Sequence, residues 1–129
     1  MKTGNLYFII DDDPDDQELF IEALKGLDDC CQCVTAFNGH EALQKLTNGM
    51  PALPDFIFLD LNMPLMNGFK CLEAIKNIAA VSHIPVIIYS TTSEKKAIED
   101  CIKAGAFSFL IKPASLPVLI QYLKDLIGQ

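Results

Sequence analysis

Basic residues are scarce in this chain of 129 residues. Ten lysines and arginines stand against seventeen aspartates and glutamates, which leaves a formal net charge of −7. A surface with this balance repels a phosphate backbone, so the composition disfavours direct binding to nucleic acid. It still allows phosphate to be handled at one local cationic position.

Long apolar runs are also missing. No run approaches the roughly 20 residues that a helix needs to cross a bilayer. The N-terminus lacks the charged and then apolar pattern of a secretory signal. The length fits one domain over residues 1–129, with no room for an output domain. We therefore expect a cytoplasmic protein of a single domain without membrane insertion.

The cysteines lack the second pair that a structural zinc site needs. Their number is odd and suggests no disulfide framework; they are Cys30, Cys31, Cys33, Cys71 and Cys101. Cys30, Cys31 and Cys33 resemble half of a metal cluster, but neither histidine lies at zinc-finger spacing. Free thiols in a reducing compartment are the simpler interpretation, and the sequence assigns these three cysteines no role.

Internal repeats are absent, and short apolar runs alternate with stretches of helical periodicity. The apolar runs predict five strands, at residues 6–10, 33–37, 56–59, 85–89 and 107–111. The helical faces that follow them contain Leu19, Phe20, Ala23, Leu24 and Leu27; Ala42, Leu43 and Leu46; Phe69, Leu72, Ile75 and Ala79; Ala97, Ile98, Cys101 and Ile102; and Leu116, Leu119, Ile120, Leu123 and Ile127.

This alternation predicts an α/β fold. Continuous apolar strands indicate burial on both faces, and strand–helix alternation indicates a parallel sheet with right-handed crossovers. We expect a flavodoxin-like, doubly wound sheet of five strands in the order 2-1-3-4-5, between two layers of helices. The stripe from Phe69 to Ala79 should belong to the core.

Polar side chains follow four of the predicted strands. Asp11 and Asp12 follow the first strand, Asp60 the third, Ser90 the fourth and Lys112 the fifth. Ligands of doubly wound sheets bind outside the carboxyl ends of the strands, so these side chains should converge. Three neighbouring carboxylates need a cation to stay ionised, and Mg²⁺ suits a site with few protein ligands. A carboxylate can act as the nucleophile for a phosphoryl group, and a lysine can neutralise the oxygens of that group.

These motifs, in this order and spacing, resemble the receiver domain of two-component response regulators, of the stand-alone kind seen in chemotaxis regulators. The resemblance covers essentially the whole chain. Its motifs are the acidic pair, the loop Asp-x-x-Met-Pro-x-Met-x-Gly from Asp60 to Gly68, Ser90, and Lys112-Pro113. It implies a phosphoacceptor protein of phosphorelay signal transduction that catalyses only its own phosphorylation and dephosphorylation.

The resemblance also implies a role for each matching residue. Asp60 would accept the phosphoryl group from a sensor histidine kinase or a phosphotransfer protein. Asp12 would coordinate Mg²⁺ directly, Asp11 directly or through water, and Asn62 through its backbone carbonyl. Lys112 would pair with Asp60 and then with the phosphate.

A conformational switch is implied as well. Ser90 would bond to a phosphoryl oxygen and draw its loop inward, and Phe109 would swing inward with it. Tyrosine is common at that position, and phenylalanine can report by packing but has no hydroxyl. Asn62 and Thr92 would tune the lifetime of the phosphoryl group, and the Lys112–Pro113 bond would be cis. An unknown downstream protein would contact the face of helix 4, strand 5 and helix 5, and phosphorylation could be linked to homodimer formation.

Other kinds of protein fit less well. Asp11, Asp13, Asp15 and Glu22 have the spacing of a calcium EF-hand, but Asp16 stands where the loop needs glycine, and a strand precedes it. A flavin phosphate needs a cradling loop after the first strand, where this chain has carboxylates. A haloacid-dehalogenase-like phosphatase needs a second aspartate where this chain has Asn62. A binding module that works without phosphorylation would not need the full set of site residues.

The acidic run divides between the site and the first helix. Asp11 and Asp12 face the metal, Asp13 is a good N-cap and Pro14 fits the first helical position. Asp15 and Asp16 lie in the first turn, where carboxylates favour the positive end of the helix dipole. By the same reasoning Ser93 should be the N-cap of the fourth helix, because Ser90 is assigned to the site.

Overall fold

Five parallel strands form one sheet in the computed structural model, which describes residues 4–50, 52–63, 66–112 and 115–128. The order is β2-β1-β3-β4-β5, as predicted. The strands are β1 (Leu6–Ile10), β2 (Gln32–Ala36), β3 (Phe56–Leu59), β4 (Val86–Ser90) and β5 (Ser108–Ile111). β1 and β3 have the predicted bounds, β2 and β4 are shifted by one residue at both ends, and β5 begins one residue later than predicted.

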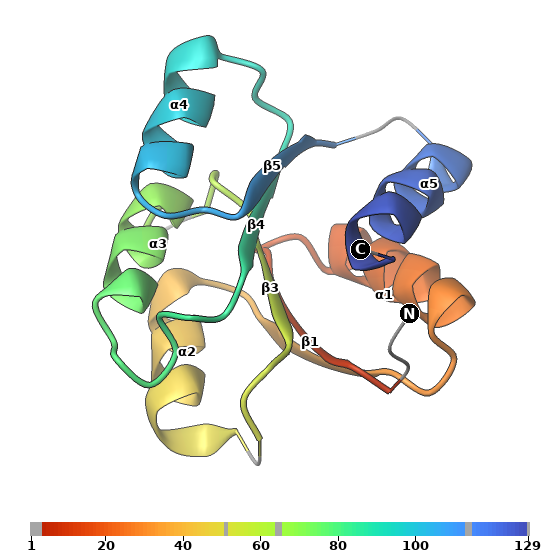
Figure 1. The fold of residues 1–129 in the computed structure, drawn as a ribbon, viewed down its shortest axis with the longest axis horizontal. Coiled ribbons are helices and arrows are strands. Elements are labelled where there is room, and N and C mark those ends of the chain that lie inside the picture. The colour runs from red at the N-terminus through yellow and green to blue at the C-terminus, as the bar shows by residue number, and fades with distance from the viewer. Residues whose placement is uncertain (1–3, 51, 64–65, 113–114, 129) are drawn as a thin grey trace.

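Helices cover both faces of the sheet (Figure 1). They are α1 (Pro14–Leu27), α2 (Gly39–Gln44), which continues as the π-helix η1 (Lys45–Gly49), α3 (Gly68–Lys76), α4 (Lys95–Lys103) and α5 (Leu116–Ile127). α1 and α5 lie on one face, and α2, α3 and α4 lie on the other. Within the described part of the chain, no helix has the length and apolar character that crossing a bilayer requires.

The central strands are buried on both faces, because helices cover them on either side. Every residue of β1 and β4 is buried, whereas the edge strands β2 and β5 are mostly half-buried. Side chains of the sheet point alternately into two cores. Phe8 and Ile57 contribute to the core under α2, α3 and α4, and Tyr7 and Phe58 to the core under α1 and α5.

The starts of α1 and α2 follow the local sequence. The Asp13 side chain accepts hydrogen bonds from the backbone N–H groups of Asp15 and Asp16, at 2.9 and 3.4 Å, so the predicted N-cap is confirmed. Asn38 caps α2 by accepting from the N–H of Glu41, and the Glu41 carboxylate accepts from the N–H of Phe37. The arrangement is close to a capping box, except that the Glu41 carboxylate bonds to the N–H of the residue before the N-cap.

Two local predictions on the face covered by α2, α3 and α4 are wrong. Ser93 does not cap α4: the N-cap position is Glu94, without a side-chain bond, and Thr92 Oγ1 accepts the Glu94 N–H at 3.5 Å. Ala79 is not core, because α3 ends at Lys76 and Ala79 is exposed in the turn that follows. The periodic spacing continued past the point where the chain turns toward β4.

Gly68 permits a close approach of α3 to the end of β3. A Cβ atom at this position would lie 2.1 Å from the backbone oxygen of Asp60 and 2.6 Å from the Leu61 Cα. The Gly68 N–H donates to the Leu61 carbonyl at 2.9 Å. Only glycine allows this contact without moving the backbone that carries Asp60.

Replacing Gly68 with alanine should therefore destabilise the protein by about 2–4 kcal/mol, because the clash is with backbone that cannot turn aside. Urea denaturation gives the free energy of unfolding. Gly26→Ala is the matched control: Gly26 lies in α1, and nothing lies within 4 Å of its added Cβ. The control should gain about 0.5–1 kcal/mol from helix propensity. Equal stability of the two variants would contradict the close approach.

Candidate functional site

The four predicted strand ends meet at one rim of the sheet, where backbone hydrogen bonds fix their positions. Directly after β1, the N–H of Asp11 donates to the carbonyl of Ala36 in β2, at 3.0 Å. The N–H of Asp60 donates to the Ile10 carbonyl at 3.0 Å, and the N–H of Lys112 to the Ser90 carbonyl at 2.8 Å. The backbone of each of these three residues thus continues the hydrogen bonding of the sheet by one residue. The position from which each side chain starts is therefore fixed.

Three carboxylates converge at this rim, as predicted. One oxygen from each of Asp11, Asp12 and Asp60 lies within 4.8 Å of the others. Asp11 and Asp60 are buried, and Asp12 is exposed. We call these three residues the acidic cluster. It is the only such group of metal-ligating side chains within the described residues.

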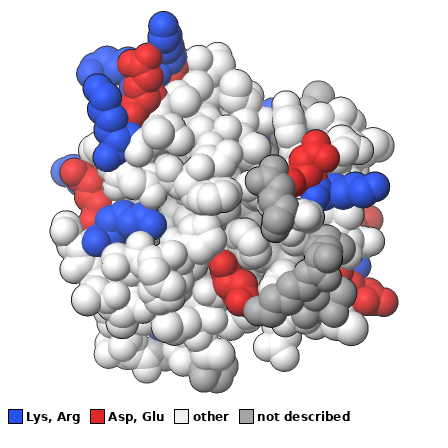
Figure 2. All heavy atoms as spheres, viewed as in Figure 1, with Lys and Arg blue, Asp and Glu red and all other residues white. Residues whose placement is uncertain are grey.

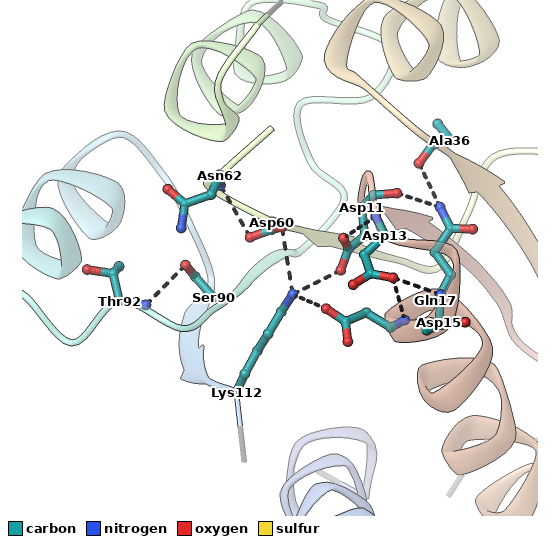
Figure 3. Close-up of polar contacts among 11 residues, drawn as sticks. Asp11, Asp13, Asp15, Gln17, Ala36, Asp60, Asn62, Ser90, Thr92 and Lys112 are labelled. Carbon is teal, nitrogen blue, oxygen red and sulfur yellow. Dashed lines mark hydrogen bonds and ion pairs between the residues drawn. The ribbon is translucent and has the colours of Figure 1, made fainter. Parts of the chain in front are cut away.

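The Lys112 ammonium lies among the carboxylates (Figure 3). Its Nζ is 3.1 Å from Asp11 Oδ2, 2.9 Å from Asp16 Oδ2 and 3.7 Å from Asp60 Oδ2. The pairing with Asp60 that the family resemblance implied is present as an ion pair, but the hydrogen bonds go to Asp11 and Asp16. Asp16 is thus a member of the site, and its assignment to the helix dipole alone was incomplete.

Burial sets the protonation of the acidic cluster. Loss of hydration raises the pKa of Asp60 to about 6; the Lys112 charge opposes the shift, and the Asp11 charge adds to it. Burial also raises the pKa of Asp11, against the hydrogen bond from the Asp13 N–H and the attraction of Lys112. Without a further cation, the ionised state of these carboxylates is therefore costly.

Lys112 stays protonated in this setting. Burial by itself would lower its pKa, but the hydrogen bond to Asp16 and the charges of Asp60 and Asp11 outweigh that and raise the pKa above its usual value. Its Nζ also lies 5.4 Å from the centroid of the Tyr89 ring, within cation–π range. The ammonium thus keeps its positive charge at the rim.

Gln17 is a supporting residue that the sequence analysis missed. Its buried side chain donates from Nε2 to the backbone carbonyls of Asp11, at 2.7 Å, and Ala36, at 3.0 Å. These bonds tie the start of α1 to the ends of β1 and β2. A glutamine on the inner face of a predicted helix was the available signal, because buried amides need partners.

Ser90 and Asn62 flank Asp60 on the side away from α1 (Figure 3). The Asn62 N–H donates to Asp60 Oδ1 at 3.2 Å. Ser90 is fully buried, and its Oγ accepts the N–H of Thr92 at 3.3 Å. Phe109 is half-buried and packs against the core under α2, α3 and α4. Its predicted swing, like the phosphoryl role of Ser90, stays a prediction.

The donor set at the rim suits a hard divalent cation. All the converging groups are oxygens, and they carry negative charge that one lysine does not balance. Oxygen ligands with open positions for water are what Mg²⁺ prefers. The residues present therefore fit the predicted metal, with Asp11, Asp12 and Asp60 as the side-chain donors.

The remaining sequence motifs lie elsewhere or outside the described residues. All five cysteines are free thiols, and Cys30, Cys31 and Cys33 lie at or before β2, at the opposite end of the sheet from the acidic cluster. Pro64, Pro113 and the predicted cis bond fall outside the described residues.

Comparison with protein families gives a match to the response regulator receiver domain over residues 7–124. The chain is 35% identical over 119 residues to a protein-glutamate methylesterase/protein-glutamine glutaminase of Clostridium acetobutylicum. The aligned region covers 91% of this chain and 33% of that protein. It is 37% identical over 105 residues to the two-component response regulator ARR15 of Arabidopsis thaliana. The aligned region covers 75% of this chain and 50% of that protein. The chain thus spans a third to a half of the length of these relatives.

Solved structures have the same fold. The phosphorylated cyanobacterial phytochrome response regulator RcpA is similar with a TM-score of 0.87 and 29% identity, over 96% of this chain and 91% of that one. The chemotaxis response regulator CheY4 of Vibrio cholerae has a TM-score of 0.82 and 25% identity, over 95% of this chain and 98% of that one.

The raised pKa of Asp60 predicts a pH-dependent stability. In the folded state the Asp60 carboxyl has a pKa of about 6, against an ordinary value of 3.8, so it keeps its proton to a higher pH than in the unfolded chain. Asp60 therefore stabilises the fold most below the lower value, and that stabilisation is lost as the pH rises through about 6. In metal-free buffer at about pH 7.5, Asp60→Asn should raise the free energy of unfolding by on the order of 2 kcal/mol. The gain should shrink steadily as the pH falls toward the lower pKa.

Urea denaturation across this pH range, with chelator present, measures the effect. Asp15→Asn is the control, because Asp15 is an exposed aspartate in the first turn of α1. A gain for Asp60→Asn that did not change with pH would contradict the shifted pKa.

Proposed function

The chain belongs to the response regulator receiver domain family, and from this premise we propose that Asp60 is its phosphoacceptor and that Lys112 and Ser90 serve the transfer. The observation that carries the proposal is the position of Asp60. It is buried at the carboxyl end of β3, between two further carboxylates and an ammonium group 3.7 Å away. A nucleophilic carboxylate with cationic support beside it is what phosphoryl transfer needs.

The transfer exchanges one bond to phosphorus for another. A carboxylate oxygen of Asp60 attacks the phosphorus of a phosphohistidine, the P–N bond breaks, and the imidazole leaves with its electron pair and takes up a proton. The product is an acyl phosphate on Asp60. Lys112 neutralises charge on the phosphoryl oxygens, and the Ser90 hydroxyl donates to one of them.

Mg²⁺ is the proposed cofactor of this transfer. Asp11, Asp12 and Asp60 would hold it by their side chains, and Asn62 by its backbone carbonyl. The bound cation would neutralise charge shared by the carboxylates and the incoming phosphoryl oxygens. The hydrogen bond from the Asn62 N–H to Asp60 Oδ1 keeps that carboxylate oriented with its second oxygen toward Lys112.

Receiver domains take their phosphoryl groups from histidine kinases or phosphotransfer proteins, and we propose the same class of donor here. We also propose that catalysis by this chain is limited to its own phosphorylation and dephosphorylation. That residues 1–129 act as a single receiver domain in the cytoplasm stays a prediction, as does phosphorylation-linked homodimer formation.

The proposed output surface comprises α4, β5 and α5, and its partner is a downstream protein. Among the described residues, five of the eight exposed large hydrophobic side chains lie along these elements: Ile102, Phe107, Ile111, Val118 and Tyr122. Charged side chains of both signs gather over α4 (Figure 2). The surface is next to the loop after β4, so a movement of Ser90 and Thr92 toward a phosphoryl group would reach α4 directly.

The two other functions considered lack support. A haloacid-dehalogenase-like phosphatase uses an acid/base aspartate two residues after the nucleophile, and Asn62 holds that position. A binding module independent of phosphorylation would have no need for the buried Asp60 and the partly buried Lys112, because removing charged groups from water is costly.

Asp60→Asn should abolish phosphorylation by acetyl phosphate and Mg²⁺, because an amide cannot form the acyl phosphate. Mass spectrometry of the intact protein, with hydroxylamine to cleave acyl phosphates, gives the readout. Asp15→Asn should be phosphorylated like the unaltered protein. A hydroxylamine-sensitive phosphoryl group on Asp60→Asn would refute the assignment of the acceptor.

Asp12→Asn should weaken Mg²⁺ binding by about tenfold or more, since one charged ligand of the proposed site is removed. The dissociation constant follows from titration by NMR, with the backbone amides around residues 11–13 and 60–62 as reporters. Asp15→Asn removes the same charge from a side chain outside the acidic cluster and should change the constant much less. Equal losses for the two variants would mean that Asp12 does not coordinate the ion.

A further inference from the structure

Lys112 is shared among three carboxylates, and its strongest contact is not with the proposed phosphoacceptor. Its Nζ lies 2.9 Å from Asp16 Oδ2 and 3.1 Å from Asp11 Oδ2, both hydrogen bonds. Asp60 Oδ2 is 3.7 Å away, beyond hydrogen-bond distance. The ammonium is therefore drawn toward the start of α1 and away from Asp60.

Asp16 has the properties of an anchor that can release its partner. Its side chain is 39% exposed, against 12% for Lys112, so water can solvate the Asp16 carboxylate once the ammonium leaves. Asp11 differs, because it is buried and belongs to the acidic cluster. The α1 N-cap fixes the origin of the Asp16 side chain through the bond from its N–H to Asp13 Oδ1.

From this geometry we propose that Asp16 is a positioning residue that holds Lys112 back from Asp60 in the unphosphorylated protein. The proposal rests on the proposed function of Asp60. Arrival of a phosphoryl group draws Lys112 from Asp16 to the phosphoryl oxygens, and Asp16 passes into water. The ion pair with Asp16 thus opposes phosphoryl binding and sets how strongly the phosphorylated state is favoured.

Beryllofluoride with saturating Mg²⁺, a non-covalent analogue of the phosphoryl group, provides the test. Asp16→Asn should bind it about two- to fivefold more tightly than Asp15→Asn, as expected for the loss of a partly exposed ion pair. Asp15→Asn is a closely matched control. It removes the same charge from the same helical turn, from an exposed side chain in place of the one that contacts Lys112.

A second background separates anchoring from simple charge. In Lys112→Gln protein, Asp16→Asn and Asp15→Asn should bind beryllofluoride equally, because the anchored group is gone. If Asp16→Asn still bound beryllofluoride more tightly than Asp15→Asn without Lys112, Asp16 would act through its negative charge alone. That result would overturn the proposal. So would equal affinities of the two variants when Lys112 is present.

Mg²⁺ titration without beryllofluoride keeps the test open if Lys112→Gln binds the analogue too weakly to measure. Lys112 freed from Asp16 turns to Asp11 and Asp60 and competes with the cation. Asp16→Asn should therefore weaken Mg²⁺ binding more in the Lys112 background than in the Lys112→Gln background, and equal losses in both would overturn the anchor. If the unaltered protein and Asp60→Asn bound beryllofluoride alike, the proposed function itself would fail, which is a separate result.

Discussion

Like charges brought together in a poorly hydrated place are the constraint on which this structure depends. The ends of β1 and β3 are adjacent because the two strands pair in the sheet, and an aspartate directly follows each of them. Burial of Asp11 and Asp60 costs hydration, and their mutual repulsion adds to the cost. Proteins keep such an arrangement where its energy is used. Here the three carboxylates form a group that could hold a metal ion, and a bound cation would relieve their unfavourable charge.

The sequence was sufficient for the sheet order and for the acidic cluster, and the reason is geometric. Parallel strands end at one edge, so a residue that directly follows a strand has a predictable place. Asp16 and Gln17 follow no strand. Whether a side chain on the first turn of α1 reaches the rim depends on the direction of the helix over the sheet, which periodicity does not give. The missed cap of α4 and the exposure of Ala79 have a related cause, because the exact residue at which a helix starts or stops depends on the chain path beyond it.

The two sides of Asp60 differ in how firmly they are built. On the α3 side, backbone contacts fix it: Gly68 lies against its carbonyl, and the Asn62 N–H bonds to its carboxylate. Toward β4 and β5, the Lys112 ammonium is divided among three carboxylates, and the Ser90 Oγ accepts the N–H of Thr92. Backbone contacts thus set the position of Asp60, whereas the neighbouring Lys112 is held by ion pairs between side chains.

The distance along the chain between Lys112 and its partners has a consequence for biosynthesis. The ammonium and the Asp11 carboxylate are 101 positions apart, and among the described strands of the sheet β5 comes last in the chain. On the ribosome, the strands that bear the aspartates emerge well before their counter-charge. A nascent chain that packs β1 against β3 early must keep these carboxylates hydrated, protonated or bound to a metal ion until β5 arrives. Docking of the last strand therefore also completes the charge balance of the site, and an incomplete chain cannot hold this edge of the sheet as the finished protein does.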